Sequence, residues 1–255
     1  MRITSYNILD GGTGRLDELA AVLERQRPDI VGLVEAEDAD LVQALARRLE
    51  MDFIVSAGRK HASALLSRFT IEQTINHAVI SERFSRSALE AAVVVPAMGT
   101  VPIAVVHLHS RAFEADERVR EKEVAALLDV MAGHRERGVS HLLCGDFNAD
   151  PPTQKIDLEK AKKKTREAFE ANGGFIPRRS IQRLLDAGYI DTLRAARGDA
   201  ADVMTSFTTD RPGQRVDHIF AWGIQLQHVR DAWIDQGELT EKASDHFPVG
   251  AELNM

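Results

Sequence analysis

The sequence predicts an α/β protein with two stacked sheets and helices on the outside, rather than one parallel doubly wound sheet. Three observations favour this class. Short buried strands alternate with amphipathic helices early in the chain, strands dominate the later part, and the connections between them vary in length. The chain has 255 residues, which is enough for one large core or two small ones.

Each expected strand is a short apolar run bounded by turn-forming residues. The runs at 89–95 and 101–108 flank residues 97–100, and this spacing predicts a hairpin. The expected strands are residues 2–9, 30–34, 53–55, 62–66, 69–80, 89–95, 101–108, 140–144, 205–208, 216–222 and 247–253.

Three stretches repeat apolar residues at helical spacing. The first begins after Thr13, a candidate N-cap, and ends before Pro28. A second helix carries leucines one turn apart between residues 41 and 49, and a longer helix covers residues 114–131.

Residues 152–183 differ from the rest of the chain because lysines and arginines crowd this stretch. One interpretation is a solvated helix on a basic surface insertion, which is the commoner meaning of such a charge run. The other is a basic flap that holds a phosphate-rich substrate. The sequence leaves both open.

Charge and cysteine content limit the functional class. The net charge is -7 and the pI is ≈ 5.7, which argues against tight duplex DNA binding and suits a site that collects cations. The single cysteine, Cys144, excludes an internal disulfide and is expected to be a small buried hydrophobe. The first residues lack a signal peptide, and no apolar run approaches the ~20 residues that span a bilayer. The cytoplasm is therefore the expected location, with no membrane contact.

Polar residues collect at the ends of the predicted strands, where a rigid scaffold meets solvent. Any one of them alone would be read as a turn former or a structural residue. Together they form a hard, oxygen-rich set that suits Mg²⁺ or Mn²⁺ rather than structural Zn²⁺. They are Asn7, Glu35, His107, His109, Asp146, Asn148, Asp217, Asp245 and His246.

Six motifs resemble those of the endonuclease/exonuclease/phosphatase superfamily, the DNase I-like and exonuclease III-like metal-dependent hydrolases. Their order and spacing follow the family nearly end to end. The resemblance implies a single domain over residues 1–255, folded as a four-layer αββα sandwich of two stacked mixed sheets flanked by helices. The motifs are Thr4–Asn7, Asp29–Glu35, Val106–Leu108, Gly145–Asn148, Val216–Ile219 and Ser244–Val249.

The resemblance also implies a divalent metal, Mg²⁺ with Mn²⁺ as a substitute. Glu35 would be the principal metal ligand, and Asn7 and Asp245 would assist it directly or through water. A bound cation together with imidazole and amide donors absorbs the charge that develops when a phosphate ester is hydrolysed.

The same resemblance assigns catalytic roles to five residues. His246 would contact the scissile phosphate, and Asp217 would orient its ring. Asp146 would position or deprotonate the attacking water. Asn148 would hold Asp146 and a phosphoryl oxygen, and His107 would add a further donor to the phosphate.

Other assignments stay open. His107 and His109 lie two residues apart on an expected strand, so they are expected to share a face, and His107 fits the family pattern better. Arg111 and Arg118 could reach the phosphate or form surface ion pairs with nearby glutamates. The remaining histidines, His61 among them, show no partner pattern and are expected to be structural.

The catalytic core predicts a phosphodiesterase or phosphatase but does not name its substrate. The acidic balance and an aromatic content of only 5% favour a small phosphate ester over DNA or RNA, although an exonuclease III-type nuclease remains the main alternative. Phe207 and Trp222 could stack on a base, but a core position is expected for both. A third class, an inactive binding protein on this fold, would require the loss of core residues, and these are present. No obligate protein partner is indicated.

Overall fold

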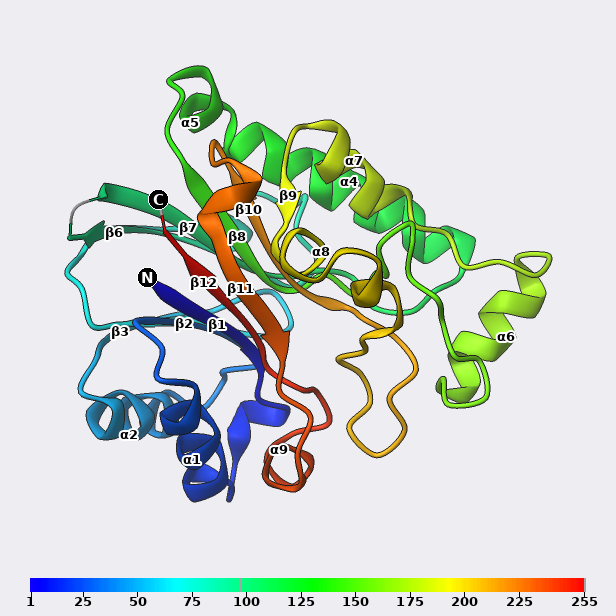
Figure 1. The fold of residues 1–255 in the computed structure, drawn as a ribbon, viewed down its shortest axis with the longest axis horizontal. Coiled ribbons are helices and arrows are strands. Elements are labelled where there is room, and N and C mark those ends of the chain that lie inside the picture. The colour runs from blue at the N-terminus through cyan, green and yellow to red at the C-terminus, as the bar shows by residue number, and fades with distance from the viewer. Residues whose placement is uncertain (97, 255) are drawn as a thin grey trace.

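Two six-stranded sheets pack face to face, and helices cover their outer sides (Figure 1). The computed structural model describes residues 1–96 and 98–254. Each sheet contains parallel and antiparallel neighbours, so the predicted four-layer αββα sandwich of two mixed sheets is confirmed. In order, the first sheet contains β11 (Val229–Ile234), β12 (Val249–Leu253), β1 (Arg2–Asn7), β2 (Ile30–Val34), β4 (Ser63–Ser67) and β3 (Asp52–Ser56). The second contains β5 (Ile71–Asn76), β6 (Ser87–Val95), β7 (Gly99–His107), β8 (His141–Asp146), β10 (Asp217–Trp222) and β9 (Ile190–Asp191).

The helices form the two outer layers, as Figure 1 shows. On the side of the first sheet lie α1 (Leu16–Gln26), α2 (Ala39–Leu49) and α9 (Glu238–Ala243). On the side of the second lie α3 (His77–Ile80), α4 (Glu114–Val130), α5 (Ala132–Glu136) and α7 (Arg179–Asp186). The short α8 (Thr192–Arg197) packs on β10 and β11, and α6 (Lys163–Ala171) extends to one side of the sandwich.

Apolar side chains fill three layers between these elements. The central layer joins the inner faces of the two sheets and includes Ile3, Leu65 and Val105. The sheets approach closely at Gly32, where an added Cβ would lie 2.6 Å from the Sγ of Cys144. Cys144 is buried, as expected, and burial raises the pKa of its thiol to about 12, so it acts as a packing residue.

Several local expectations are wrong. Helix α1 begins at Leu16 without a side-chain cap, because the Thr13 hydroxyl donates to the carbonyl of Asp10 instead. The strand expected over 69–80 ends at Asn76, whose side chain caps α3 through the N–H of Val79. Residues 205–208 are not a strand, and within them Phe207 forms isolated bridges to Gln214 and His246. Strands β9 and β11 are absent from the expected set.

The expected hairpin is present in its strands, since β6 and β7 pair antiparallel as far as Val95 and Gly99. Its residue Ala97 lies outside the described residues. Across the described part of the chain, no helix combines the length and the apolar character that crossing a bilayer requires.

Candidate active site

Polar side chains from both sheets meet at one end of the sandwich. Strands β1 and β2 run parallel in the first sheet, as do β7 and β8 in the second, so the carboxyl ends of each pair lie together. Strand β10 runs the other way and begins beside the end of β8, with Asp217 opposite Asp146. The side chains gathered here are Asn7, Glu35, His107, Asp146, Asp217, Asp245 and His246.

Asp146 lies at the centre of this group. Its Oδ2 accepts a hydrogen bond from Nδ2 of Asn7 at 3.3 Å and lies 3.4 Å from Nε2 of His107. Its Oδ1 accepts from the backbone N–H of Asn148 at 2.8 Å. Burial, together with the nearby charge of Asp217, raises the pKa of Asp146 to about 7. A carboxylate with a raised pKa is suited to proton transfer near neutral pH.

His246 is held by Asp217. The Nδ1–H of His246 donates to Oδ2 of Asp217 at 2.8 Å, and the same oxygen accepts from the Ser206 hydroxyl at 2.7 Å. The opposite ring nitrogen, Nε2, faces Asn7 at 3.4 Å and Asp146 at 3.9 Å. Burial alone would lower the pKa of His246, but the carboxylates, Asp217 foremost, raise it to about 9. The ring is therefore a cation at neutral pH.

Glu35 and Asn7 join the two sheets at this end. The Asn7 amide nitrogen lies 3.3 Å from Oε1 of Glu35 and 3.3 Å from Oδ2 of Asp146, so it bridges two carboxylates. Glu35 follows β2 in a left-handed conformation with φ of 55°, which is uncommon for this residue type. Its Oε2 accepts the backbone N–H of Asp10 at 3.1 Å.

The donor set fits a divalent cation. Four carboxylates gather within this group, and the buried oxygens Oδ1 of Asp217 and Oδ1 of Asp245 have no hydrogen-bond partner. Buried anionic oxygens without donors are costly unless a cation compensates them. Two triplets offer ligand atoms that all lie within 4.8 Å of one another: Asp146 with Asp217 and His246, and Glu35 with His61 and His107. Neither triplet coincides with the expected set of Asn7, Glu35 and Asp245.

The structure separates the residues around the end of β7. This strand ends at His107, so His109 lies beyond it, and the expectation that the two share a face is wrong. His107 contacts Asp146, whereas the ring of His109 turns to Asp116 at 2.9 Å. Arg118 is exposed and pairs with Glu114, 3.4 Å away on the same helix, so it is a surface ion pair.

Two expected substrate contacts line a cavity beside the group. Arg111 and Asn148 border a cavity of ≈ 630 Å³ together with Lys162 and Phe207. Asn148 holds Asp146 through its backbone N–H, while its side-chain amide donates to the carbonyl of Leu108 at 3.0 Å.

Three further residues at the site belong to no motif or strand-end pattern, and a fourth, Lys162, lies in the basic segment 152–183. Arg86 is buried just before β6 and donates to Nε2 of His107 and, at 2.6 Å, to the Ser110 hydroxyl. His61 stacks on His107 with ring centroids 5.0 Å apart, so it is not remote from the site. Ser206, described above, orients Asp217.

Phe207 belongs to this end of the molecule rather than to the core. Its ring centroid lies 4.4 Å from that of His246, and the ammonium of Lys162 lies 4.1 Å from the Phe207 centroid. Lys162 also lies 3.3 Å from Oδ2 of Asp245. Trp222, by contrast, packs at the margin of the core under α7 and donates to the carbonyl of Ala187.

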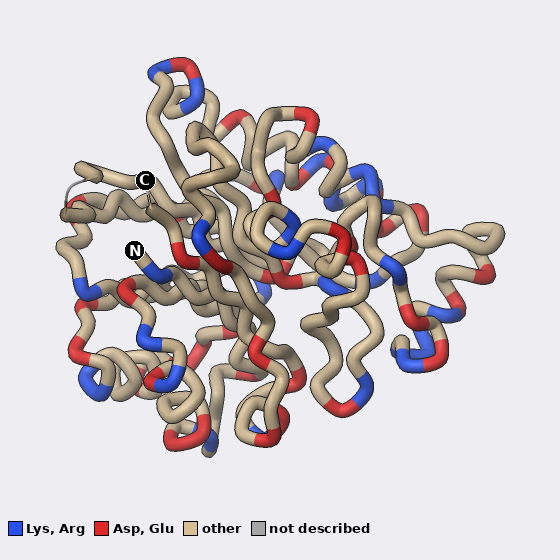
Figure 2. Tube along the Cα trace, viewed as in Figure 1, with Lys and Arg blue, Asp and Glu red and all other residues tan. Residues whose placement is uncertain are grey.

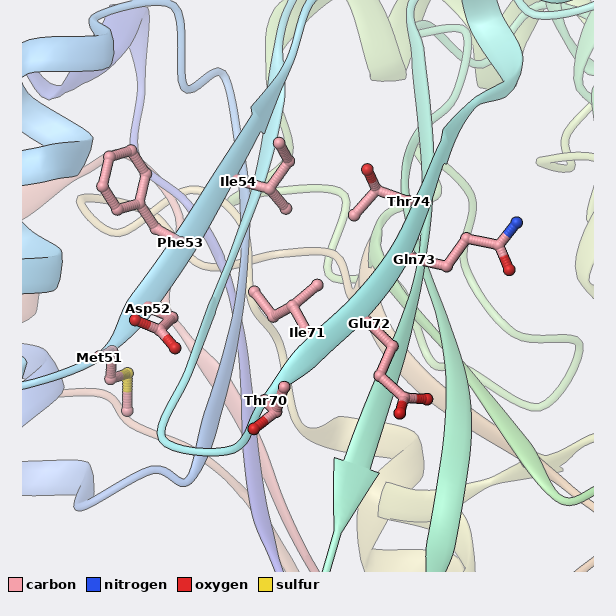
Figure 3. Close-up of a pocket in the computed structure, with 9 residues that line it drawn as sticks. All are labelled: Met51, Asp52, Phe53, Ile54, Thr70, Ile71, Glu72, Gln73 and Thr74. Atoms are coloured by element: carbon pink, nitrogen blue, oxygen red, sulfur yellow. The ribbon is translucent and has the colours of Figure 1, made fainter.

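A second groove lies elsewhere, between the outer strands β3 and β5 (Figure 3). Its volume is ≈ 500 Å³, and its lining runs over Met51–Ile54 and Thr70–Thr74. None of the clustered residues described above lines this groove, so it is separate from the candidate site.

A two-sheet sandwich that gathers carboxylates, imidazoles and an amide at one end has the donors that hydrolysis of a phosphate ester requires. The chain belongs to the Endonuclease/Exonuclease/phosphatase family, whose model matches residues 4–246. It is 26% identical over 272 residues to the exodeoxyribonuclease III of Haemophilus influenzae, covering 99% of this chain and all of that protein.

Solved structures share the fold over the whole chain. The 3′ phosphatase NExo from Neisseria, bound to a product DNA hairpin, superposes with a TM-score of 0.77 at 23% identity, with all of both chains covered. An AP endonuclease from Archaeoglobus fulgidus gives a TM-score of 0.74 at 19% identity, again over all of both chains.

Proposed function

We propose that the protein is a divalent-metal-dependent hydrolase that cleaves phosphate esters of DNA at or near a 3′ end. The observation that carries this proposal is the contact of Asp146 with Asn7 from one sheet and His107 from the other, beside the His246–Asp217 pair. The exodeoxyribonuclease III relative and the DNA-bound 3′ phosphatase structure support DNA as the substrate class. This choice replaces the small phosphate ester that the acidic composition favours, because net charge does not describe one local surface.

Under this proposal, Asp146 accepts a proton from the attacking water. Its buried position and raised pKa make it a base rather than a fixed anion. His246 donates from Nε2 to a non-bridging phosphoryl oxygen, and Asp217 keeps its ring cationic and oriented. His107 and Asn148 support Asp146 on the neighbouring side, His107 by its contact at 3.4 Å and Asn148 through its backbone N–H.

Glu35 would be the principal ligand of the metal, with Asn7 and Asp245 beside it. Mg²⁺ is the proposed ion and Mn²⁺ its substitute, because the direct ligands would be carboxylate oxygens, while Asn7, whose Oδ1 accepts from the N–H of Leu9, would assist through water. When bound, the cation neutralises phosphoryl charge and orients the ester. The partnerless Oδ1 of Asp245 supports this assignment.

We further propose that the basic segment 152–183 contacts the substrate. Lys162 already reaches the site through Asp245 and Phe207, and Lys163 and Lys164 border the same cavity as Arg111. Figure 2 shows Lys and Arg residues along the segment around α6, interspersed with acidic residues. Helix α6 is anchored by Thr165, whose hydroxyl donates to buried Gln214 at 2.8 Å. The phosphate backbone of a DNA substrate next to the scissile ester would contact these lysine side chains.

Because both sheets supply the proposed site, we also propose that residues 1–255 form a single domain. The two sheets could not be separated without dividing Asn7 and Glu35 from Asp146.

A substrate panel tests the proposed function. A DNA hairpin with a 3′ phosphate, a duplex with a recessed 3′ hydroxyl, an abasic duplex and bis(p-nitrophenyl) phosphate are compared with Mg²⁺, Mn²⁺ and EDTA. Turnover of a DNA substrate with either metal, abolished by EDTA, is expected. His246→Ala and Asp146→Asn are expected to lose at least ~100-fold in rate. Cleavage of the small diester alone refutes DNA as the substrate, and full activity in EDTA refutes the metal.

A further inference from the structure

A second group of metal-ligand side chains adjoins the proposed catalytic residues. Glu35, His61 and His107 come from three different segments: the residue after β2, the loop between β3 and β4, and the end of β7. Their ligand atoms all lie within 4.8 Å of one another, which is within the span of one coordination sphere. The two imidazole rings stack with an interplanar angle of 26°.

The tautomer of His61 is fixed by an outer carboxylate. Its Nδ1 lies 2.7 Å from Oε1 of Glu37, so the N–H at Nδ1 donates there and the lone pair remains on Nε2. Histidines that bind metals usually donate their other ring N–H to a carboxylate or carbonyl. His61 thus has the second partner expected of a metal ligand.

His107 is the buried member of the group. Its side chain is 1% exposed, and its Nδ1 has no hydrogen-bond partner. The Arg86 guanidinium donates to its Nε2 and also binds the Ser110 hydroxyl. The positive charge of Arg86 therefore weakens the binding of a cation at this site. When His107 binds a cation, Arg86 can keep its hydrogen bond to the Ser110 hydroxyl.

We propose that Glu35, His61 and His107 form a site for a second divalent cation. Two imidazoles and one carboxylate select a transition-metal ion such as Mn²⁺, Co²⁺ or Zn²⁺ over Mg²⁺. Glu35 would be a ligand of both this second cation and the cation of the proposed function. The second site does not depend on which phosphate ester the protein cleaves. Glu37 is its positioning residue, acting through His61.

Mn²⁺ binding to the whole chain tests this site by isothermal titration, with free ion counted by electron paramagnetic resonance. Wild type is expected to bind two Mn²⁺ ions and His61→Ala one. Glu37→Gln keeps all three ligands and should weaken the second ion about 10–100-fold. Arg86→Met removes the positive charge beside the site and should raise the affinity for the second Mn²⁺ ion.

His77→Ala is the matched control. His77 also pairs with a carboxylate, Glu90, at 2.7 Å, and its side chain is 16% exposed, as is that of His61. This variant should bind two ions as wild type does. Thermal melting in EDTA confirms that each variant is folded.

The proposal is overturned if His61→Ala binds Mn²⁺ with the same stoichiometry and affinity as wild type. It is also overturned if wild type binds only one Mn²⁺ and the affinity for that ion does not change in His61→Ala. Neither result touches the proposed function, which is tested by Mg²⁺-supported turnover in the same preparations. Loss of one Mn²⁺ in His61→Ala, with the other ion still bound and with His77→Ala unchanged, establishes the second site.

Discussion

The charge of Asp217 can be removed with little change of shape. Its Oδ2 accepts hydrogen bonds from His246 at 2.8 Å and from Ser206 at 2.7 Å. In Asp217→Asn, an amide oxygen in this place keeps both bonds and loses only the charge. A hydrogen bond to a charged group contributes about 1.5–3 kcal/mol, against about 0.5–1.5 kcal/mol between neutral groups. The difference, about 1–1.5 kcal/mol, corresponds to roughly tenfold in rate.

We therefore expect the single-turnover rate constant of Asp217→Asn to fall at least about tenfold, because His246 also loses the main carboxylate that keeps its ring cationic. That of Asp217→Ala should fall at least about 100-fold, because alanine also frees the His246 ring. The assay is single-turnover hydrolysis of the best substrate at saturating Mg²⁺, with substrate affinity measured separately. Ser206→Ala keeps the carboxylate and should lose no more than about threefold. A rate for Asp217→Asn equal to wild type, or a larger loss in Ser206→Ala than in Asp217→Ala, would falsify the orienting role.

Three further predictions follow from single contacts. His107→Ala should lower the hydrolysis rate at least about tenfold, and His109→Ala less than threefold, because only His107 contacts the central carboxylate; equal losses would contradict this division. Gly32→Ala should destabilise the fold by about 1–3 kcal/mol in urea unfolding, because its Cβ would lie 2.6 Å from Cys144; an unchanged midpoint argues against a rigid sheet interface. Burial lowers the pKa of His141 to about 4, so the unfolded chain binds a proton first as pH falls below 6.5, and stability is lost between pH 6.5 and 4. The advantage of wild type over His141→Gln should shrink by about 2 kcal/mol from pH 7 to pH 5, and a constant difference would refute it.

The sequence predicts the layers and much of the site because strand ends are visible in it. Asn7, Asp146 and Asp217 lie at or next to the ends of apolar runs, and turn-forming residues mark those ends. Parallel neighbours then bring successive carboxyl ends together without further information. His109 shows the limit of this reasoning: moving the end of one strand by a residue or two changes the direction of a side chain completely.

Other site residues depend on register and on loops, which no local pattern encodes. Arg86 reaches His107 because Ser87 pairs with His107 across β6 and β7, a register set by the packing of the whole sheet. Phe207 reaches His246 through an isolated bridge rather than a strand. An aromatic residue in a short apolar run gives no indication whether it faces a core or a cavity.

The distribution of the site over both sheets has a mechanical consequence. Asn7 belongs to the first sheet and Asp146 to the second, yet the amide nitrogen and the carboxylate oxygen lie 3.3 Å apart. The only covalent link between them is the long chain from β1 to β8, so the spacing of the sheets sets this distance. Close packing resists small changes in that spacing, and Gly32 lets the sheets approach because it has no side chain. Gly32, which packs between the sheets, is therefore expected to influence the geometry of the proposed metal ligands relative to the proposed base.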